Sequence, residues 1–213
     1  TEIVDYANFA SIGTNEERLR ELLAFLANIS QETTGGWATA PGGRYAWGLY
    51  FNEEVGYSGT SNIGYVDASN TSYPAASGKS YHGRGPIQLS WNYNYGQVSE
   101  FLFGDKNVLL NNPDSVTSSG ALAFQTALWF WMTPQYPKPS CHDVMAGNWQ
   151  PNATQASTGL IAGFGATVNI INGGIECNSG VEIAKVQHRI GHFSRYTTFK
   201  NIGMALDGSN SPI

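Results

Sequence analysis

Two glutamates, Glu32 and Glu54, lie 22 positions apart and belong to different kinds of predicted structure. Glu32 comes at the end of a predicted helix, where the helix dipole disfavours a carboxylate and so favours the protonated form that a general acid needs. Glu54 lies in an irregular, glycine-rich segment. Two carboxyls on opposite walls of a cleft, one protonated and one ionised, are what hydrolysis of a glycosidic bond requires. The alternative for Glu32 is a solvated carboxylate at a helix end.

The stretch 80–96, SYHGRGPIQLSWNYNYG, mixes aromatic rings with amides and hydroxyls. It has no helical period, and Gly83, Gly85 and Pro86 give its backbone a special path before 87–89, the only plausible short strand. Flat aromatic faces beside amides and hydroxyls suit a neutral polyhydroxylated ligand, because sugars present apolar ring faces and a rim of hydroxyls. The alternative is a buried aromatic loop whose amides are satisfied internally.

Helices dominate the pattern that must position these residues. A capping box at 14–17 begins a helix that is predicted to run to about Gln31 and to end before Gly35. The segment Ser118–Met132 is apolar nearly all round and is predicted to be the buried central helix. Shorter helices are predicted at 140–146, 166–171 and 181–196, with a polar linker at 147–156. The irregular region from Pro41 to about Ser80 is long for a compact domain, and such loops are usually functional.

Composition narrows the range of partners. Charged residues make up 13% of the chain, against about 25% in ordinary soluble domains, and the formal net charge is −5 without a basic block. Nucleic acid and anionic membranes are therefore not expected, and a neutral polymer fits best. No apolar run reaches the roughly 20 residues that cross a bilayer. His188 and His192 have i,i+4 spacing without an evident third ligand, so we expect neither a metal nor a cofactor.

Four segments resemble glycoside hydrolase family 19, the plant-type endochitinases that also occur in bacteria. They are QETTGGW at 31–37, YAWGLYFNEE at 45–54, the stretch 80–96, and NIINGGIEC at 169–177. They occur in the family's order and span most of the chain. The resemblance implies a single catalytic domain over residues 1–213. Its implied fold is mainly α, in the α+β lysozyme-like superfamily: two helical lobes, a deep substrate cleft and a small β-sheet near Ile87–Leu89.

The resemblance also assigns roles to three residues. Glu32 would be the general acid, Glu54 the general base, and Ser90 the hydroxyl that shares the attacking water with the base. Members of the family invert the anomeric configuration, which implies a carboxyl separation of about 6.5–9.5 Å or more. Glu53 is adjacent to the base and has the same chemistry, but the match through FNEEVG places the base at Glu54. Glu53 is therefore expected to be a solvated loop charge.

A further set of side chains is expected to bind the sugar chain or to line its cleft: Thr34, Tyr73, Tyr81, Gln88, Tyr93, Asn94, Lys138, Asn172, Glu176 and Arg189. Within it, Arg189 and Glu176 match an Arg–Glu pair close to the acid and base. Two positions depart from the family: Gln31 replaces a histidine before the acid, and Tyr73 replaces a tryptophan of the binding site. The second change puts the strength of one sugar subsite in doubt.

Cys141 and Cys177 are the only cysteines. In plant members, the resemblance implies, the cysteine of the GGIEC segment pairs with one near the C-terminus, and that partner is missing here. Cys177 therefore either pairs with Cys141 or is free, and we favour a disulfide between them.

The first functional hypothesis is a secreted, monomeric endochitinase acting on β-1,4-linked N-acetylglucosamine chains. The sequence has no signal peptide, so we expect it to be the mature form of such a protein. A muramidase-like wall lysin, which is known in the wider family, keeps the chemistry but changes the substrate; the acidic chain disfavours a wall that is already negative. A chitin-binding or antifungal protein without turnover is the third hypothesis, although a pure binder need not retain two opposed carboxyls.

Overall fold

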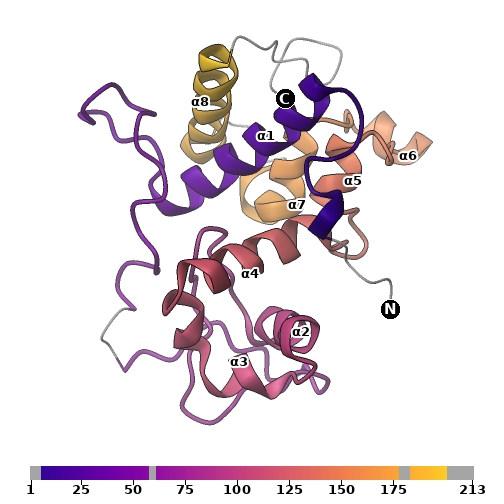
Figure 1. The fold of residues 1–213 in the computed structure, drawn as a ribbon. Helices are drawn as coiled ribbons and strands as arrows, with labels where there is room; N and C mark the ends of the chain where they lie inside the picture. Colours follow the sequence, from indigo (N-terminus) through magenta and orange to yellow (C-terminus); the bar gives the residue numbers. More distant parts are fainter. Residues whose placement is uncertain (1–5, 58–60, 178–182, 201–213) are drawn as a thin grey trace. The chain divides into compact units, whose positions relative to one another are not determined.

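The computed structural model describes residues 6–57, 61–177 and 183–200, and within them the chain is mainly helical (Figure 1). The mainly α class predicted from the sequence is confirmed. The helices, with 3-10 helices labelled η, are η1 Tyr6–Asn8, α1 Asn15–Thr33, α2 Asn92–Phe103, α3 Asn107–Asn111, η2 Pro113–Thr117, α4 Gly120–Met132, α5 Cys141–Met145, α6 Ala153–Ser157, α7 Phe164–Glu176 and α8 Ala184–Phe199.

The chain divides into two compact units. The first unit comprises Thr1–Gly48 and Trp131–Ile213, and the second comprises Leu49–Phe130. The first unit contains α1, α5, α6, α7 and α8, and the second contains α2, α3 and η2. Glu32 therefore belongs to the first unit and Glu54 to the second.

Helix α1 begins where the capping box predicts. The Thr14 amide donates to Glu17 Oε2 at 2.7 Å, and the Glu17 amide donates to Thr14 Oγ1 at 3.3 Å. This reciprocal cap satisfies amides that the first helical turn leaves without partners. The helix then packs along α8 through a buried apolar face (Figure 1). It ends at Thr33, two residues later than predicted, so Glu32 lies in its last turn.

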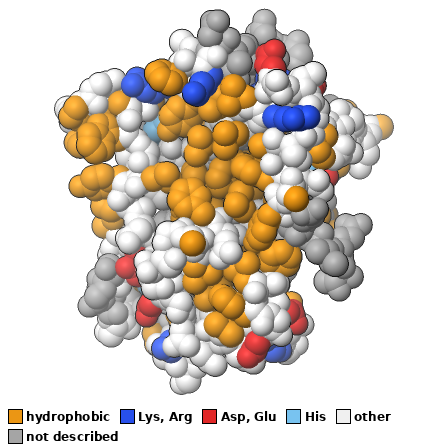
Figure 2. All heavy atoms as spheres, viewed as in Figure 1, with side chains coloured by type: hydrophobic (Ala, Val, Ile, Leu, Met, Phe, Trp, Pro, Cys, Tyr) orange, Lys and Arg blue, Asp and Glu red, His pale blue; other side chains and the backbone are white. Residues whose placement is uncertain are grey.

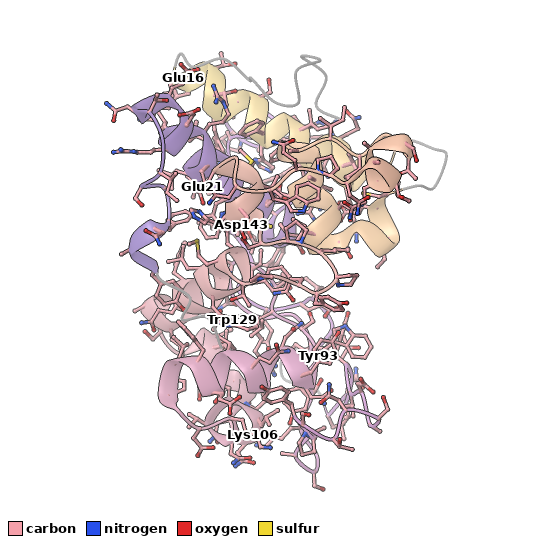
Figure 3. All side chains as sticks on the ribbon, turned by 90° about the vertical axis from the view of Figure 1, so that its right-hand side faces the viewer. Glu16, Glu21, Tyr93, Lys106, Trp129 and Asp143 are labelled. Carbon is pink, nitrogen blue, oxygen red and sulfur yellow. The ribbon has the colours of Figure 1, made fainter. Side chains whose placement is uncertain are left out.

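A buried polar cluster fixes α1 against α5 in the first unit. Glu21, labelled in Figure 3, is only 2% exposed. Its Oε1 accepts hydrogen bonds from Trp131 Nε1 at 3.0 Å and from His142 Nδ1 at 2.7 Å. Its Oε2 accepts from the Ala10 amide at 3.1 Å. Because a buried charge is costly unless it is paired, these three contacts make the cluster a strong constraint on the packing.

The His142–Glu21 contact predicts a pH-dependent free energy of unfolding. Burial alone would lower the pKa of His142, but the hydrogen bond and charge of Glu21 outweigh it and raise the pKa above its ordinary value of 6.5. A raised folded pKa gives stability that is complete below the unfolded value and is lost as the pH rises through the folded one. We expect urea denaturation of the wild type and of His142→Phe to differ most near pH 5.5 and less by pH 9. A difference that grows with pH would contradict this.

In the second unit, the chain before α2 is irregular, as predicted for the region up to Ser80. Arg84 is 2% exposed and anchors the centre of the unit. Its guanidinium donates to Ser80 O at 3.0 Å, to Tyr95 Oη at 3.1 Å and to Asp114 Oδ1 at 2.6 Å. Arg84 therefore connects the stretch 80–96 to η2.

Several predicted elements differ from the structure. The small sheet expected near Ile87–Leu89 is wrong: among the described residues there are only two isolated bridges, Glu53–Arg84 and Arg84–Leu89. Pro86 and positive φ angles at Gly85 and Gln88 turn the backbone too sharply for a ladder. Helix α2 follows directly from Asn92, although this stretch shows no helical period.

Helix boundaries were also misplaced. Helix α4 starts at Gly120 and not at Ser118, and its first turns are exposed, with Phe124 38% accessible. The helix that was expected to be buried is therefore exposed on one side of its first half, whereas Ala123, Thr126 and Ala127 on its other side are buried. Helix α7 continues past Gly173 to Glu176, and the chain kinks at Asn172. The polar linker contains the start of α6, which has its own capping box between Asn152 and Gln155.

The expected disulfide is also wrong, because Cys141 and Cys177 are both free thiols. Cys141 is fully buried as the first residue of α5, and its sulfur lies 4.0 Å from Thr167 O. Burial raises the pKa of both thiols, which keeps them protonated. The elimination argument from the sequence failed because a buried cysteine can serve as a small apolar side chain without pairing.

Lys, Arg, Asp and Glu side chains are sparse on the face in Figure 2, where hydrophobic side chains are exposed over wide areas. This agrees with a charged content of 13%. No helix in the described part of the chain has the length and apolar content needed to span a membrane.

Candidate active site

Glu32 lies against a buried arginine in the first unit. Its side chain is 17% exposed, and Oε1 accepts a short hydrogen bond from Arg189 Nη2 of α8. The same guanidinium donates to both carboxylate oxygens of Glu176, each at 2.8 Å. Its remaining contacts are with Asn28 of α1, to Oδ1 at 3.2 Å and to the carbonyl at 3.3 Å. One cation therefore serves two carboxyl groups from two different helices.

The two carboxyl groups that share Arg189 differ in their burial. Arg189 and Glu176 have fully or almost fully buried side chains, at 1% and 0% exposure. Burial alone would raise the pKa of Glu176, but the hydrogen bonds and charge of Arg189 outweigh it and lower the pKa below its usual value. Burial would likewise lower the pKa of Arg189, and the two carboxylates raise it. Glu176 and Arg189 thus form the permanent ion pair.

The kink in α7 lies at Asn172, whose side chain contacts the ion pair. Asn172 has non-helical backbone angles, φ −145° and ψ 27°, and its Nδ2 donates to Glu176 Oε1 at 2.8 Å. Lys138 lies on the same side of the first unit, because its Nζ donates to Asn169 O of α7 at 2.6 Å. Burial lowers the pKa of Lys138. The structure therefore joins three of the predicted residues, Asn172, Glu176 and Arg189, to Glu32 in one network.

The loop after Glu32 is fixed to α8 by two histidines. His192 is fully buried, and its Nε2 donates to Gly35 O at 2.9 Å. A Cβ on Gly36 would lie 2.5 Å from the His188 ring, so only glycine allows this approach. Burial lowers the pKa of both histidines, which keeps them neutral. The two histidines, spaced i,i+4 on α8, thus position the loop that follows α1.

Glu54 lies in the second unit and accepts two hydrogen bonds. Tyr65 Oη donates to its Oε1 at 2.8 Å, and the Gly83 amide donates to its Oε2 at 3.2 Å. The Glu54 amide in turn donates to Gly83 O at 2.9 Å. Burial, and then the hydrogen bond to Glu54, raise the pKa of Tyr65 to about 12, so its hydroxyl stays a donor. The backbone and side chain of Glu54 are therefore both tied to the stretch 80–96.

Polar residues of the stretch 80–96 form hydrogen bonds with one another. Ser90 Oγ donates to Gln88 O at 2.8 Å, and Asn94 Nδ2 donates to Ser90 O at 2.9 Å. Trp91 and Tyr93 stack with ring centroids 6.1 Å apart. Of the five non-glycine residues with positive φ in the described part of the chain, two lie in this stretch, Gln88 at 51° and Trp91 at 73°, and a third is Tyr65, the partner of Glu54, at 59°. Such angles are costly for residues with a Cβ, and they cluster at functional sites more often than elsewhere.

Comparison with known proteins identifies the family. The profile of the family described as chitinase class I, glycoside hydrolase family 19, matches residues 2–208. The chain belongs to glycoside hydrolase family 19. Chitinase 9 of Oryza sativa subsp. japonica is 48% identical over 210 residues, which are 99% of this chain and 59% of the rice protein. The crystal structure of chitinase C from Streptomyces griseus HUT6037 is similar at a TM-score of 0.69 and 35% identity, covering 92% of this chain and 66% of that one.

One of the similar proteins is named as an inactive member. Inactive chitinase-like protein 1 of Hevea brasiliensis is 49% identical over 202 residues, which are 95% of this chain and 60% of that protein. This chain spans about three fifths of the length of these curated relatives. Membership of family 19 therefore leaves the activity to be argued from the site itself.

Glu53 departs from its expected role in the family 19 site. The sequence predicts a solvated loop charge, but its side chain is 21% exposed and contacts two basic side chains, His82 and Arg84. His82 Nε2 lies 2.7 Å from Glu53 Oε1, and Arg84 Nε lies 3.6 Å from the same oxygen. The prediction failed because the partners come from the stretch 80–96, about 30 positions further along the chain.

Tyr81 is also placed differently from its prediction as a sugar-binding residue. It is fully buried, its hydroxyl donates to Leu110 O at 2.9 Å, and it accepts from the Ala76 amide at 2.7 Å. It is a core residue of the second unit. Tyr73 donates to Glu100 Oε2 at 2.7 Å and packs on Gly96, and Thr34 forms the C-cap of α1. Sugar contacts by Tyr73 and Thr34 stay predictions.

Sequence reasoning missed Tyr65 and an indole pair. Tyr65 has no motif or spacing to mark it, since only the path of the loop brings it to Glu54. Trp37 and Trp47 pack edge to face with centroids 5.8 Å apart, and they are 40% and 42% exposed. Their indole N–H groups donate locally, to Thr39 Oγ1 and Pro41 O. Both lie in segments that carry the family resemblance, which was the signal available.

Proposed function

We propose that this chain is an endochitinase that cleaves internal β-1,4 bonds of N-acetylglucosamine polymers with inversion of the anomeric carbon. The observation that carries the proposal is the Glu32–Arg189–Glu176 network. Glu176 is completely buried and compensates the charge of Arg189. Glu32 has the more exposed side chain and shares the same cation. Glu32 is therefore the carboxyl of this network that a substrate can reach, and in this proposal it is the general acid that donates a proton to the leaving oxygen.

Glu54 fits the role of the base. Both of its side-chain contacts, Tyr65 Oη and the Gly83 amide, are donors, which is the pattern of an ionised carboxylate. An ionised carboxylate can accept a proton from a water as that water attacks the sugar. In this proposal Ser90 helps to hold the water. The Ser90 hydroxyl donates to Gln88 O, so its lone pairs are available to accept a hydrogen bond from the water.

The proposal requires the two units to form the walls of a two-lobed enzyme with a deep cleft. Inversion then needs the Glu32 and Glu54 carboxyls about 6.5–9.5 Å or more apart across the bound chain, because a water must fit between the base and the sugar. A separation near 5 Å would instead allow direct attack and retention. The chemistry needs no cofactor.

The substrate class follows from the surfaces available. Exposed indole faces of Trp37 and Trp47 suit the apolar faces of sugar rings. The amides of Gln88, Asn94 and Asn172 are of the type that binds hydroxyl and acetamido groups. The low charge content favours a neutral chain over an anionic one. We therefore place chitin before peptidoglycan, and we propose that the enzyme acts outside the cell as a monomer.

The test is hydrolysis of soluble N-acetylglucosamine hexamer and of peptidoglycan under the same conditions. We expect cleavage of the hexamer, with proton NMR before mutarotation showing the α anomer at the new reducing end. A β anomer would overturn inversion and the assignment of Glu54 as base. Cleavage of peptidoglycan alone would make the chain a muramidase-like wall lysin.

The second candidate is a chitin-binding or antifungal protein without turnover. The specific observation in its favour is the name of the Hevea brasiliensis relative, which is 49% identical. Against it, this chain keeps Glu32 and Glu54 in polar networks that a binding protein would not need. Calorimetric binding of the hexamer without any product after prolonged incubation would support this candidate.

A further inference from the structure

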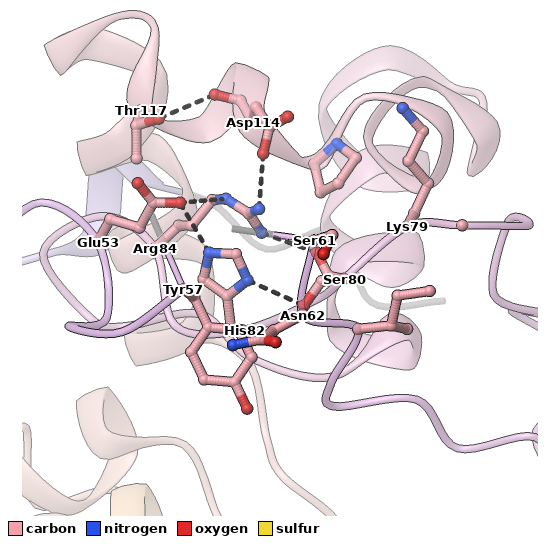
Figure 4. Close-up of a pocket in the computed structure, with 13 residues that line it drawn as sticks. Glu53, Tyr57, Ser61, Asn62, Lys79, Ser80, His82, Arg84, Asp114 and Thr117 are labelled. Carbon is pink, nitrogen blue, oxygen red and sulfur yellow. Dashed lines mark hydrogen bonds and ion pairs between the residues drawn. The ribbon is translucent and has the colours of Figure 1, made fainter. Parts of the chain in front are cut away.

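A series of hydrogen bonds joins Ser80, His82 and Glu53 in the second unit (Figure 4). Ser80 Oγ lies 2.9 Å from His82 Nδ1, and His82 Nε2 lies 2.7 Å from Glu53 Oε1. Because a carboxylate only accepts, Nε2 is the donor to Glu53. His82 is 3% exposed, and its ring stacks on Tyr57 with centroids 4.6 Å apart. The imidazole is therefore fixed at both nitrogens and on one face.

At both ends of this hydrogen-bonded series, the neighbouring residues contact Glu54. At one end, Glu53 is adjacent to Glu54, and the isolated bridge between Glu53 and Arg84 lies beside the paired hydrogen bonds of Glu54 and Gly83. At the other end, Ser80 Oγ accepts from the Gly64 amide at 3.0 Å, and Tyr65, the next residue, donates to Glu54. The Glu54 carboxylate is thus held from two sides by backbone segments that His82 connects.

We propose that His82 and Glu53 are positioning residues that fix the Glu54 carboxylate in its working orientation through Gly83 and Tyr65. This inference rests on the proposed function, in which Glu54 is the base. A base must be held close to its productive geometry, and a misplacement of about 1 Å can cost roughly 100-fold in rate. Glu54 lies on a segment without regular structure, so its orientation depends on such contacts.

The same residues line a cavity of about 380 Å³ in the second unit (Figure 4). In that cavity Ser80 Oγ contacts His82 Nδ1 and His82 Nε2 contacts Glu53, which is also the connectivity of a serine, a histidine base and an orienting carboxylate. Ser80 Oγ in addition accepts from the Gly64 amide, next to Tyr65, which donates to Glu54. This second contact of Ser80 is the one that the positioning role uses.

The test compares His82→Phe and His82→Gln in the full chain. Phenylalanine keeps the stacking on Tyr57 and removes both hydrogen bonds, whereas glutamine can restore a donor near Glu53. We expect His82→Phe to lower kcat on the N-acetylglucosamine hexamer by about tenfold with KM changed by less than about twofold, and His82→Gln to recover most of the loss. Glu53→Gln should lower kcat less, and the double variant should fall by less than the product of the single effects.

The matched control is His142→Phe, because the His142–Glu21 pair has the same 2.7 Å contact within the first unit. This variant should lower the melting temperature and leave kcat unchanged when assayed on folded protein. If it does not fold, Glu21→Gln replaces it. A wild-type kcat for His82→Phe, or an equal loss in the control, overturns the positioning role.

Hydrogen exchange separates this inference from the proposed function. The Gly83 amide, which donates to Glu54 Oε2, should exchange faster in His82→Phe than in the wild type and remain unchanged in His142→Phe. Unchanged exchange in His82→Phe overturns the inference whether or not the protein cleaves chitin. An active Glu54→Gln variant overturns the proposed function, whatever His82 does.

Discussion

Replacing Glu54 with glutamine is expected to lower kcat on chitin oligomers by about 10²–10⁴-fold, and Glu32→Gln should act similarly. Glutamine keeps the shape and most hydrogen bonds of glutamate but cannot exchange the proton that each role needs. Binding should persist, because neither change removes a ring face or an amide that would contact the sugar. Initial rates on the hexamer and isothermal calorimetry of the same oligomer measure the two quantities separately.

The control for these variants is Glu16→Gln, in the first turn of the same helix as Glu32. Glu16 is 54% exposed and forms only a surface pair with Arg20, so its removal should leave kcat unchanged. The assignment of the base fails if Glu53→Gln abolishes hydrolysis while Glu54→Gln remains active. In that case the two adjacent glutamates exchange roles.

Replacing Arg189 with methionine is expected to lower the free energy of unfolding by about 3–5 kcal/mol. Methionine fills much of the space but leaves Glu176, whose side chain is 0% exposed, without its cation. The pair of Arg20 and Glu16 provides the contrast: the Glu16 side chain is 54% exposed, so Glu16→Gln should cost less than about 1 kcal/mol. Urea denaturation at pH 7 compares the variants. Equal losses for Arg189→Met and Glu16→Gln would show that the buried pair is not the constraint inferred here.

The effect of Arg189 should also depend on pH. The pKa of Glu176 is lowered in the folded protein, so its stabilising contribution is present above the unfolded value and is lost as the pH falls through the folded one. The difference in unfolding free energy between wild type and Arg189→Met should therefore shrink in acid. A difference that widens below pH 4 would contradict this origin.

The sequence predicted best where local chemistry decides the structure. The capping box at Thr14 and Glu17 determines where α1 starts, because it depends only on neighbouring residues. The end of α7 shows the opposite case. The helix predicted at 166–171 was expected to end before the glycines at 173 and 174, yet α7 reaches Glu176 because the ion pair with Arg189 and the bond to Asn172 hold the last turn. Tertiary contacts outweighed the roughly 1 kcal/mol preference against glycine.

The candidate site shows the same contrast between residues that local motifs predict and residues that only tertiary contacts bring together. Glu32, Glu54 and Ser90 were named from motifs, and the structure adds their partners without testing their roles. Tyr65 and the true surroundings of Glu53 were out of reach, because both depend on how an irregular loop returns to the stretch 80–96. Neither periodicity nor composition describes such a path. The unpaired thiols were missed because burial, and not the count of cysteines, decides their state.

The positive φ of Gln88 implies a conflict between thermostability and catalysis in any engineering of this protein. Glycine at this position would relieve about 1 kcal/mol or more of backbone strain. It would also delete the Gln88 side chain, whose Nε2 donates to Gly85 O, beside the carbonyl that accepts from Ser90. A directed-evolution screen that rewards heat resistance alone is therefore expected to accumulate glycine here and to lose turnover as it does so.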